Sequence, residues 1–130
     1  GTKFSGQAMT KNELTQEINI VTSNFKNIHQ NADKYSIYLH TCSIKIEYKE
    51  DMDRGEVKFN NPNTCYKIEN IKNSVQDEIA LNEGNEVHLN PRSNEHHSIN
   101  FDLIIEENGN PDNNVKIKVN LFRLEEKRGS

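Results

Sequence analysis

Thr10 to Gln30, TKNELTQEINIVTSNFKNIHQ, is the most regularly patterned stretch of this 130-residue chain. Its apolar residues recur at intervals of four, three, four and three positions, which places them in one stripe along a helix. The stripe comprises Leu14, Ile18, Val21, Phe25 and Ile28. We therefore predict a helix from about Lys11 to His29 whose apolar side needs a second layer to cover it.

The beginning of this helix is encoded as well. Thr10 and Glu13 have the spacing of a capping box, in which each side chain satisfies a backbone N–H at the helix start. Met9 and Leu14 stand at the positions of a hydrophobic staple. Residues 1–9 are expected to form a flexible lead-in, and residues 10–128 a single globular domain.

The chain after the helix has the two-residue alternation of β-strands. Residues 35–48, YSIYLHTCSIKIEY, alternate but change parity near residues 40–42, which predicts either a β-bulge or two short strands. We expect a turn over residues 50–55, a short strand over 56–60 and another strand over 64–71. Residues 79–81 fit a helical turn or a short strand, and Val87 and Leu89 alternate as in a strand.

The last third predicts a long antiparallel hairpin. Ile99, Phe101, Leu103 and Ile105 share one parity, and a second set of apolar residues alternates from Val115 to Leu121. Between the two runs lies a segment rich in turn formers, residues 106–114. Lys116 and Lys118 fall on the opposite, water-facing side. The predicted fold class is α+β, mainly antiparallel β, with the N-terminal amphipathic helix packed on an antiparallel sheet or small β-sandwich.

Composition narrows the class of partner. The net charge is −4, and its 16 basic and 20 acidic residues are interspersed, whereas a nucleic-acid binder more often carries a basic patch. No apolar run is long enough to span a membrane, so membrane attachment would come only through segments outside this chain. The first and last two residues look like cloning remnants, and we expect the chain to be a piece of a longer protein.

Cys42 and Cys65 are the two cysteines of the chain. A disulfide between them would close a loop and contribute a few kcal/mol. The alternative is two buried free thiols in a cytosolic protein. We favour the disulfide, and with it an extracellular, cell-surface or periplasmic location.

No reactive centre stands out among the histidines and cysteines. Neighbours His96 and His97 point to opposite faces of a strand and lack ligands at zinc-site spacing, even if His88 approaches. Cys42 with His40 or His88 suggests a thiol nucleophile, but alternation places Cys42 within a strand, where burial is usual. We predict no catalytic residue, no metal site and no cofactor.

The carboxylates and the tyrosines do not mark a reactive or binding site either. Six carboxylates gather in two turn regions without completing a calcium loop or marking a glycosidase pair: Asp51, Asp53, Glu56, Glu106, Glu107 and Asp112. Four strand tyrosines offer a stacking surface, although packing in the core is the simpler interpretation: Tyr35, Tyr38, Tyr48 and Tyr66. The helix stripe also allows a helical partner, but we favour packing within the domain.

Two resemblances follow from these patterns. A helix followed by antiparallel strands, with Ile99, Phe101 and then Gly109 in a turn, resembles the soluble part of a type IV pilin-like subunit. It departs from that family because Thr10 looks like a true helix start and the hallmark N-terminal segment is missing. The run from Leu89 to Leu103 is similar to strand pairs of immunoglobulin-like sandwiches, without their tryptophan.

These observations favour a non-enzymatic, extracytoplasmic protein-interaction domain, acting in adhesion, recognition or assembly, with another protein as partner. The alternatives are a pilin-like assembly subunit and a small-ligand-binding or enzymatic α+β domain. The oligomeric state is left open.

Overall fold

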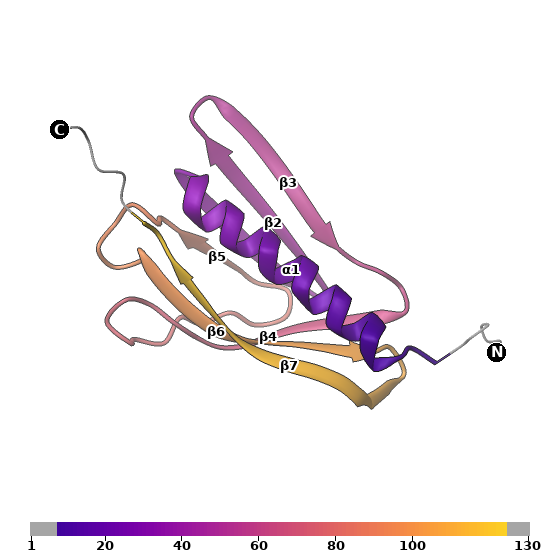
Figure 1. The fold of residues 1–130 in the computed structure, drawn as a ribbon. Helices are drawn as coiled ribbons and strands as arrows, with labels where there is room; N and C mark the ends of the chain where they lie inside the picture. The colour runs from indigo at the N-terminus through magenta and orange to yellow at the C-terminus, as the bar shows by residue number, and fades with distance from the viewer. Residues whose placement is uncertain (1–7, 125–130) are drawn as a thin grey trace.

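The computed structural model describes residues 8–124 and consists of one helix and seven strands. The helix comes first and the strands follow in the order α1 (Lys11–Asn31), β1 (Lys34–His40), β2 (Ser43–Glu50), β3 (Asp53–Phe59), β4 (Thr64–Lys72), β5 (Glu86–Leu89), β6 (Ser98–Glu107) and β7 (Asn110–Phe122). The fold is α+β and mainly antiparallel β, as the sequence predicts (Figure 1).

The helix begins where its capping box predicts. The Glu13 backbone N–H donates to Thr10 Oγ1 at 3.1 Å, and the Thr10 N–H donates to Glu13 Oε1 at 2.8 Å. All five residues of the apolar stripe are buried. Ile20, off the stripe, is 53% exposed, and His29 extends the buried side at the C-terminal end.

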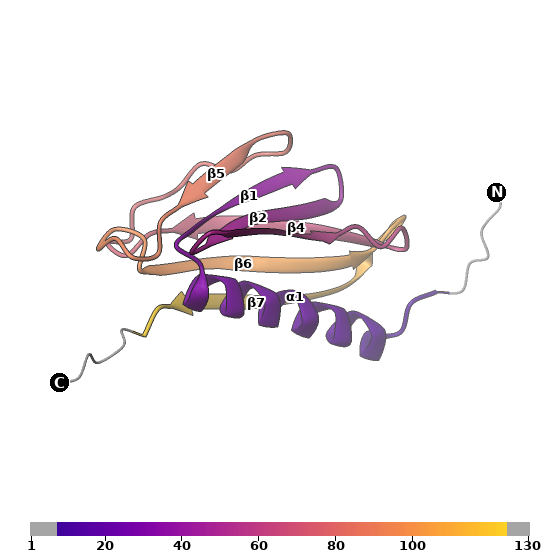
Figure 2. The ribbon, with the colours of Figure 1, turned by 90° about the horizontal axis from the view of Figure 1, so that it is seen from above.

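The strands form two antiparallel sheets, in the orders β3-β2-β1-β5 and β4-β6-β7. In Figure 2 α1 runs beside β7, and its side chains reach both sheets, since His29 Nδ1 of α1 lies 2.7 Å from Tyr35 Oη of β1. One hydrophobic cluster contains the helix stripe and inward residues of both sheets. Phe25 of α1, for example, meets Phe101 of β6 edge to face, with ring centroids 5.0 Å apart.

The parity change near residues 40–42 is a tight turn between β1 and β2, so the two-strand interpretation is confirmed. Residues 41 and 42 form the turn, and Cys42 adopts a positive φ of 57°. This turn brings Cys42 to the start of β4, where it forms a disulfide with Cys65. The Tyr66 backbone N–H also donates to the Cys42 carbonyl at 3.1 Å, so the two sheets are joined at this corner.

Several predicted boundaries were wrong. The turn expected over residues 50–55 is only two residues long, because β2 runs to Glu50 and β3 starts at Asp53. The hairpin turn expected over 106–114 shrinks to residues 108 and 109 for the same reason: polar residues continue the ladder on exposed strand ends. Residues 79–81 form neither a helical turn nor a named strand.

Of the expected lead-in, residues 1–7 lie outside the described residues, as do residues 125–128 of the expected domain. Met9 packs against the core, and its carbonyl accepts a hydrogen bond from the Asn113 side chain at 2.7 Å.

Candidate recognition face on the four-stranded sheet

The sheet β3-β2-β1-β5 has one apolar face and one polar face. Its inward residues are mostly buried, as at Tyr35 and Ile37 of β1 and Ile44 and Ile46 of β2. Side chains of the opposite parity point outward, and none of them is buried. No described element packs on this outward side, which Figure 2 shows uncovered above β1 and β5. We call it the outer face.

Strand register arranges the charges of the outer face in rows that cross the strands. Ser36 stands opposite Glu47, which stands opposite Glu56. On one side of this acidic row, two residues along each strand, Tyr38, Lys45 and Lys58 are aligned, and on the other side Lys34, Lys49 and Arg54 are aligned. We call this last set the cation row.

The acidic row is neutralised by the lysines of the next row. Lys45 Nζ lies 3.4 Å from Glu47 Oε2, and Lys58 Nζ lies 3.4 Å from Glu56 Oε2. Tyr38 Oη donates to Glu47 Oε1 at 2.8 Å, and this hydrogen bond, helped by Lys45, lowers the pKa of the Glu47 carboxyl. These five residues therefore compensate one another's charge.

The cation row has no such partners. Within residues 8–124, no carboxylate lies at ion-pair distance from Lys34, Lys49 or Arg54. Lys34 and Arg54 are exposed and Lys49 is half-buried. Like charges directly opposite each other in a sheet are destabilising, so this alignment opposes folding. Three positive charges without an ion pair among the described residues thus stand together on a protein whose net charge is −4.

Asp33, the acid that directly precedes Lys34 in the chain, is already engaged. Asp33 Oδ1 accepts from Arg92 Nε at 2.9 Å, and its Oδ2 accepts from the Asp51 backbone N–H at 2.9 Å. The Asp51 hydrogen bond is the main reason that the pKa of Asp33 is lowered, followed by Arg92, with Lys49 adding a smaller contribution. Asp33 therefore moderates the charge of Lys49 without forming an ion pair with it.

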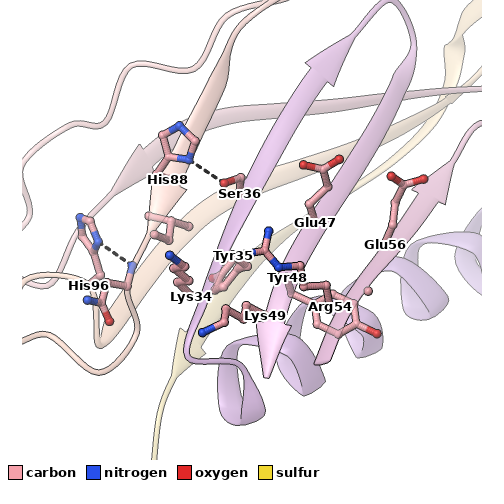
Figure 3. A pocket seen from close by; sticks show the side chains of 13 residues that line it. Lys34, Tyr35, Ser36, Glu47, Tyr48, Lys49, Arg54, Glu56, His88 and His96 are labelled. Carbon is pink, nitrogen blue, oxygen red and sulfur yellow. Dashed lines mark hydrogen bonds between the residues drawn. The ribbon is translucent and has the colours of Figure 1, made fainter. Parts of the chain in front are cut away.

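A shallow hollow of about 790 Å³ lies over this end of the outer face. Figure 3 shows that its lining comes from β1, β2, β3 and the region around β5, including Lys34, Lys49, Arg54, His88 and His96. The carboxylates of Glu47 and Glu56 project together on one side, and the cation row occupies the other side.

Gly55 shapes the edge of this hollow. It stands opposite Tyr48 in the register, and a Cβ atom at residue 55 would overlap the Tyr48 ring. Glycine thus lets the tyrosine ring lie across the edge strand, an arrangement known to support glycine in sheets. The Tyr48 ring has the inward parity of β2 and packs against the hydrophobic core, on the side of the sheet opposite Lys49 and Arg54.

The outer face also holds a string of hydrogen-bonding groups. Ser36 Oγ lies 2.6 Å from His88 Nδ1, and His88 Nε2 lies 3.4 Å from Glu86 Oε2. The order Ser36, His88, Glu86 resembles the nucleophile, general base and acid of a catalytic triad. Ser36, however, lies on a strand paired on both sides, so its backbone N–H groups serve the ladder and are not free to hold an oxyanion. The side chain of His88 is 73% exposed, so the Ser36–His88–Glu86 hydrogen bonds are open to solvent.

The histidines singled out in the sequence are not brought into one site. His96 Nδ1 accepts from the Asn90 N–H at 3.0 Å, whereas His97 packs its ring on Phe122 with centroids 4.9 Å apart. His40 lies at the end of β1, and its neighbour Cys42 is in the disulfide. That bond removes the proposed thiol nucleophile, because no free thiol is left in the described chain.

The predicted carboxylates are spread over the molecule. Glu56 belongs to the outer face, Asp51 lies in the β2–β3 turn, and Asp53 begins β3. Glu106 pairs with Lys67 at 3.3 Å on the other sheet. Glu107 Oε1 accepts from the Asn113 amide at 3.0 Å, and Asp112 lies on exposed β7. Among residues 8–124, no group of three or more potential ligands is placed to hold a metal ion.

The tyrosines mostly pack. Tyr35 and Tyr66 are buried, and burial raises the pKa of both phenols, assisted at Tyr66 by Glu17, whose Oε2 accepts its hydroxyl at 2.5 Å. Tyr38 and Tyr48 are half-buried. The four rings therefore do not form an exposed stacking surface.

Neither the cation row nor a role for His29 was predicted from the sequence. Lys34 and Lys49 lie just outside the strand pattern of residues 35–48, and Arg54 lies in the predicted turn over residues 50–55. Their alignment depends on register, which the sequence does not display. His29 appeared only as the expected helix end. The sequence signal for a role of His29 was its position, directly after the stripe residue Ile28 in the last turn of the helix.

Comparison with protein-family models, with curated proteins and with solved structures gave no match. Fold and site alone therefore define the class: a disulfide-linked, sandwich-like α+β protein with an uncovered, charge-patterned sheet face. The disulfide indicates an oxidising compartment. No helix among the described residues is long and apolar enough to cross a membrane.

Proposed function

We propose that this protein is a non-catalytic, extracytoplasmic recognition domain that binds another protein through its outer face. The observation that carries the proposal is the cation row: three aligned positive side chains that, within residues 8–124, have no ion-pair partner and lie on a sheet face that no described element covers. Sequence features that oppose local stability tend to occur at functional sites.

The other sheet provides the comparison. On its outward side, Lys67 pairs with Glu106 at 3.3 Å and Lys118 pairs with Asp102 at 3.3 Å. Asp102 is further held by the Asn70 amide at 2.9 Å, which is the main cause of its lowered pKa. On that face Lys118 is paired and Lys116 has no carboxylate at ion-pair distance within residues 8–124, whereas one end of the outer face aligns three such cations in a row.

The scaffold behind the outer face suits recognition. The disulfide closes a loop between residues 23 positions apart and joins the two sheets at one corner. A rigid sheet keeps its side chains in a fixed pattern, so little ordering is needed on binding. Extracellular, cell-surface or periplasmic recognition fits the oxidising conditions that the disulfide requires.

Site-specific photo-crosslinking tests this function. A photoreactive residue replaces Ser36 at the centre of the outer face, and in a matched protein it replaces Asn120, which is exposed on the outward side of β7. Both proteins are irradiated with the envelope and secreted fractions of the source cells. We expect one adduct from position 36 that excess unlabelled protein removes, and no such adduct from position 120. Equal labelling from both positions would contradict the proposal.

The compartment has its own test. Native protein alkylated before and after reduction is compared by mass spectrometry. We expect alkylation of Cys42 and Cys65 only after reduction. Full alkylation without a reductant would place the protein in a reducing compartment and reject the location.

A further inference from the structure

We propose that the cation row docks an acidic segment of the partner protein, laid across β1, β2 and β3. This inference rests on the recognition function proposed above and names the chemistry of the partner at that face. Lys34, Lys49 and Arg54 would each face a carboxylate of the segment.

Spacing supports a segment that crosses the strands. Neighbouring strands are about 4.8 Å apart, so the row spans roughly 10 Å. Carboxylates on one side of an extended peptide recur every 6–7 Å or so, a separation that two lysine stems and an arginine can match by adjusting their rotamers. The Arg54 guanidinium can also hold a carboxylate through two parallel hydrogen bonds.

The charge pattern favours a protein over a uniform polyanion. Glu47 and Glu56 lie two residues further along β2 and β3, beside the cation row. A sulfated polysaccharide or nucleic acid would repel this acidic row wherever it extended beyond the cations. A protein segment can instead carry carboxylates against the cations and neutral or basic groups against the glutamates. Such alternation gives specificity as well as attraction.

The hollow offers the acidic segment a concave binding surface. Its lining includes all three cations of the row, together with Glu47 and Glu56. Ser36, His88 and Asn90 supply polar groups around it. The hollow and the unpaired cations are separate observations that coincide at one end of the outer face (Figure 3).

Binding of a defined probe tests the inference. The probe is a fluorescent peptide of alternating glutamate and serine, measured by anisotropy at low ionic strength. The test variant is Lys34→Glu/Arg54→Glu. The control is Lys26→Glu/Lys116→Glu, which makes the same change in net charge at two exposed lysines on α1 and on the outward side of β7. Thermal unfolding verifies that both variants are folded.

We expect the control to bind the peptide as the wild type does, and the test variant to bind about tenfold more weakly. Equal affinity in the two variants, or no binding by the wild type, would overturn the inference. A parallel titration with heparin tests whether the row binds a uniform polyanion instead. If heparin binds more tightly than the peptide and loses that affinity only in the test variant, the cation row is a polyanion site and the inference of an acidic protein segment is overturned.

Failure here is separable from failure of the proposed function. If the peptide does not bind but position 36 still crosslinks a specific partner, recognition through the outer face stands and the acidic segment is rejected.

Discussion

At the residue scale, His29 shows how a single polar group is held within the core. Its ring is 1% exposed, its Nδ1 lies 2.7 Å from Tyr35 Oη, and its Nε2 lies 2.9 Å from the His97 carbonyl. A neutral imidazole fits both partners, with Nε2–H donating to the carbonyl and Nδ1 accepting from the phenol. Burial is the main cause of the lowered pKa of His29, with the His97 carbonyl opposing it.

This lowered pKa predicts a pH dependence of stability. In the unfolded chain the histidine titrates near 6.5, whereas in the folded protein it titrates at lower pH. Between these two values the unfolded state binds more protons, so the free energy of unfolding decreases as pH falls from 6.5 toward the folded pKa. Above 6.5 the full stability is present. Urea unfolding across this range measures the effect.

A matched variant isolates the contribution of His29. We expect His29→Gln to lose about 1–2 kcal/mol at neutral pH through imperfect hydrogen bonding. Its stability should also vary less with pH above about 5.5, where unfolded carboxyls are almost fully ionised. A wild type and a variant with parallel pH profiles in that range would contradict the role given to His29.

At the scale of elements, strand pairing creates features that no single strand contains. The cation row takes Lys34 from β1, Lys49 from β2 and Arg54 from β3, which are separated along the chain and adjacent only in the register. Lys49 stands in the middle, with a positive charge on each side. The row therefore combines a candidate binding site with a local cost in stability.

Neutralising the central lysine separates these two effects. We expect Lys49→Gln to stabilise the protein by roughly 0.2–1 kcal/mol at low salt, because two like-charge repulsions are removed. Lys45→Gln is the control, and should be neutral or destabilising, since Lys45 pairs with Glu47 and lies 4.4 Å from the centre of the Tyr38 ring. Chemical unfolding measures both variants. High salt should shrink the gain, and a loss of stability in Lys49→Gln would contradict the account.

The helix depends on its first turn in a way the sequence already indicates. We expect Thr10→Ala to lose about 1 kcal/mol, because the Glu13 N–H loses its acceptor. Thr15→Ala, at an exposed position inside α1, should be neutral or slightly stabilising. Thermal unfolding of the two variants compares them directly, and equal losses would mean that the capping box contributes little.

Elements with strong local patterns could be predicted, and their pairing could not. The helix stripe from Leu14 to Ile28 and the alternation around Phe101 depend on neighbours in sequence, so they are visible in it. Hydrophobic periodicity also cannot mark where a strand ends, so the exposed charged ends of β2 and β3 were assigned to a turn. Register depends on contacts between distant residues, which is why the cation row emerged only from the structure.

At the scale of the whole molecule, the disulfide links the two sheets that share the core. Cys65 is 6% exposed and belongs to β4, while Cys42 belongs to the turn after β1. Closing a loop of this length restricts the unfolded chain and stabilises the fold by about 3 kcal/mol. The core extends over the helix and both sheets, so the bond adds stability to a fold that the core already defines.

Removing the disulfide tests whether the core alone defines the fold and the disulfide only adds stability. We expect Cys42→Ser/Cys65→Ser to keep the wild-type circular dichroism spectrum while losing about 2–4 kcal/mol in denaturant unfolding. The reduced wild type should unfold with the same midpoint as the variant. A variant without native structure at any denaturant concentration would show that the core cannot hold the sheets together alone.

The central claim is that the outer face, at its cation row, is where this protein meets its partner. Titrating isotope-labelled protein with the alternating glutamate–serine peptide, and following backbone amide shifts by NMR, tests it most directly. We expect the largest shifts to cluster at Lys34, Lys49 and Arg54 and to fade with added salt. Shifts centred instead on β4 and β7, or scattered evenly over the lysines of the molecule, would contradict it.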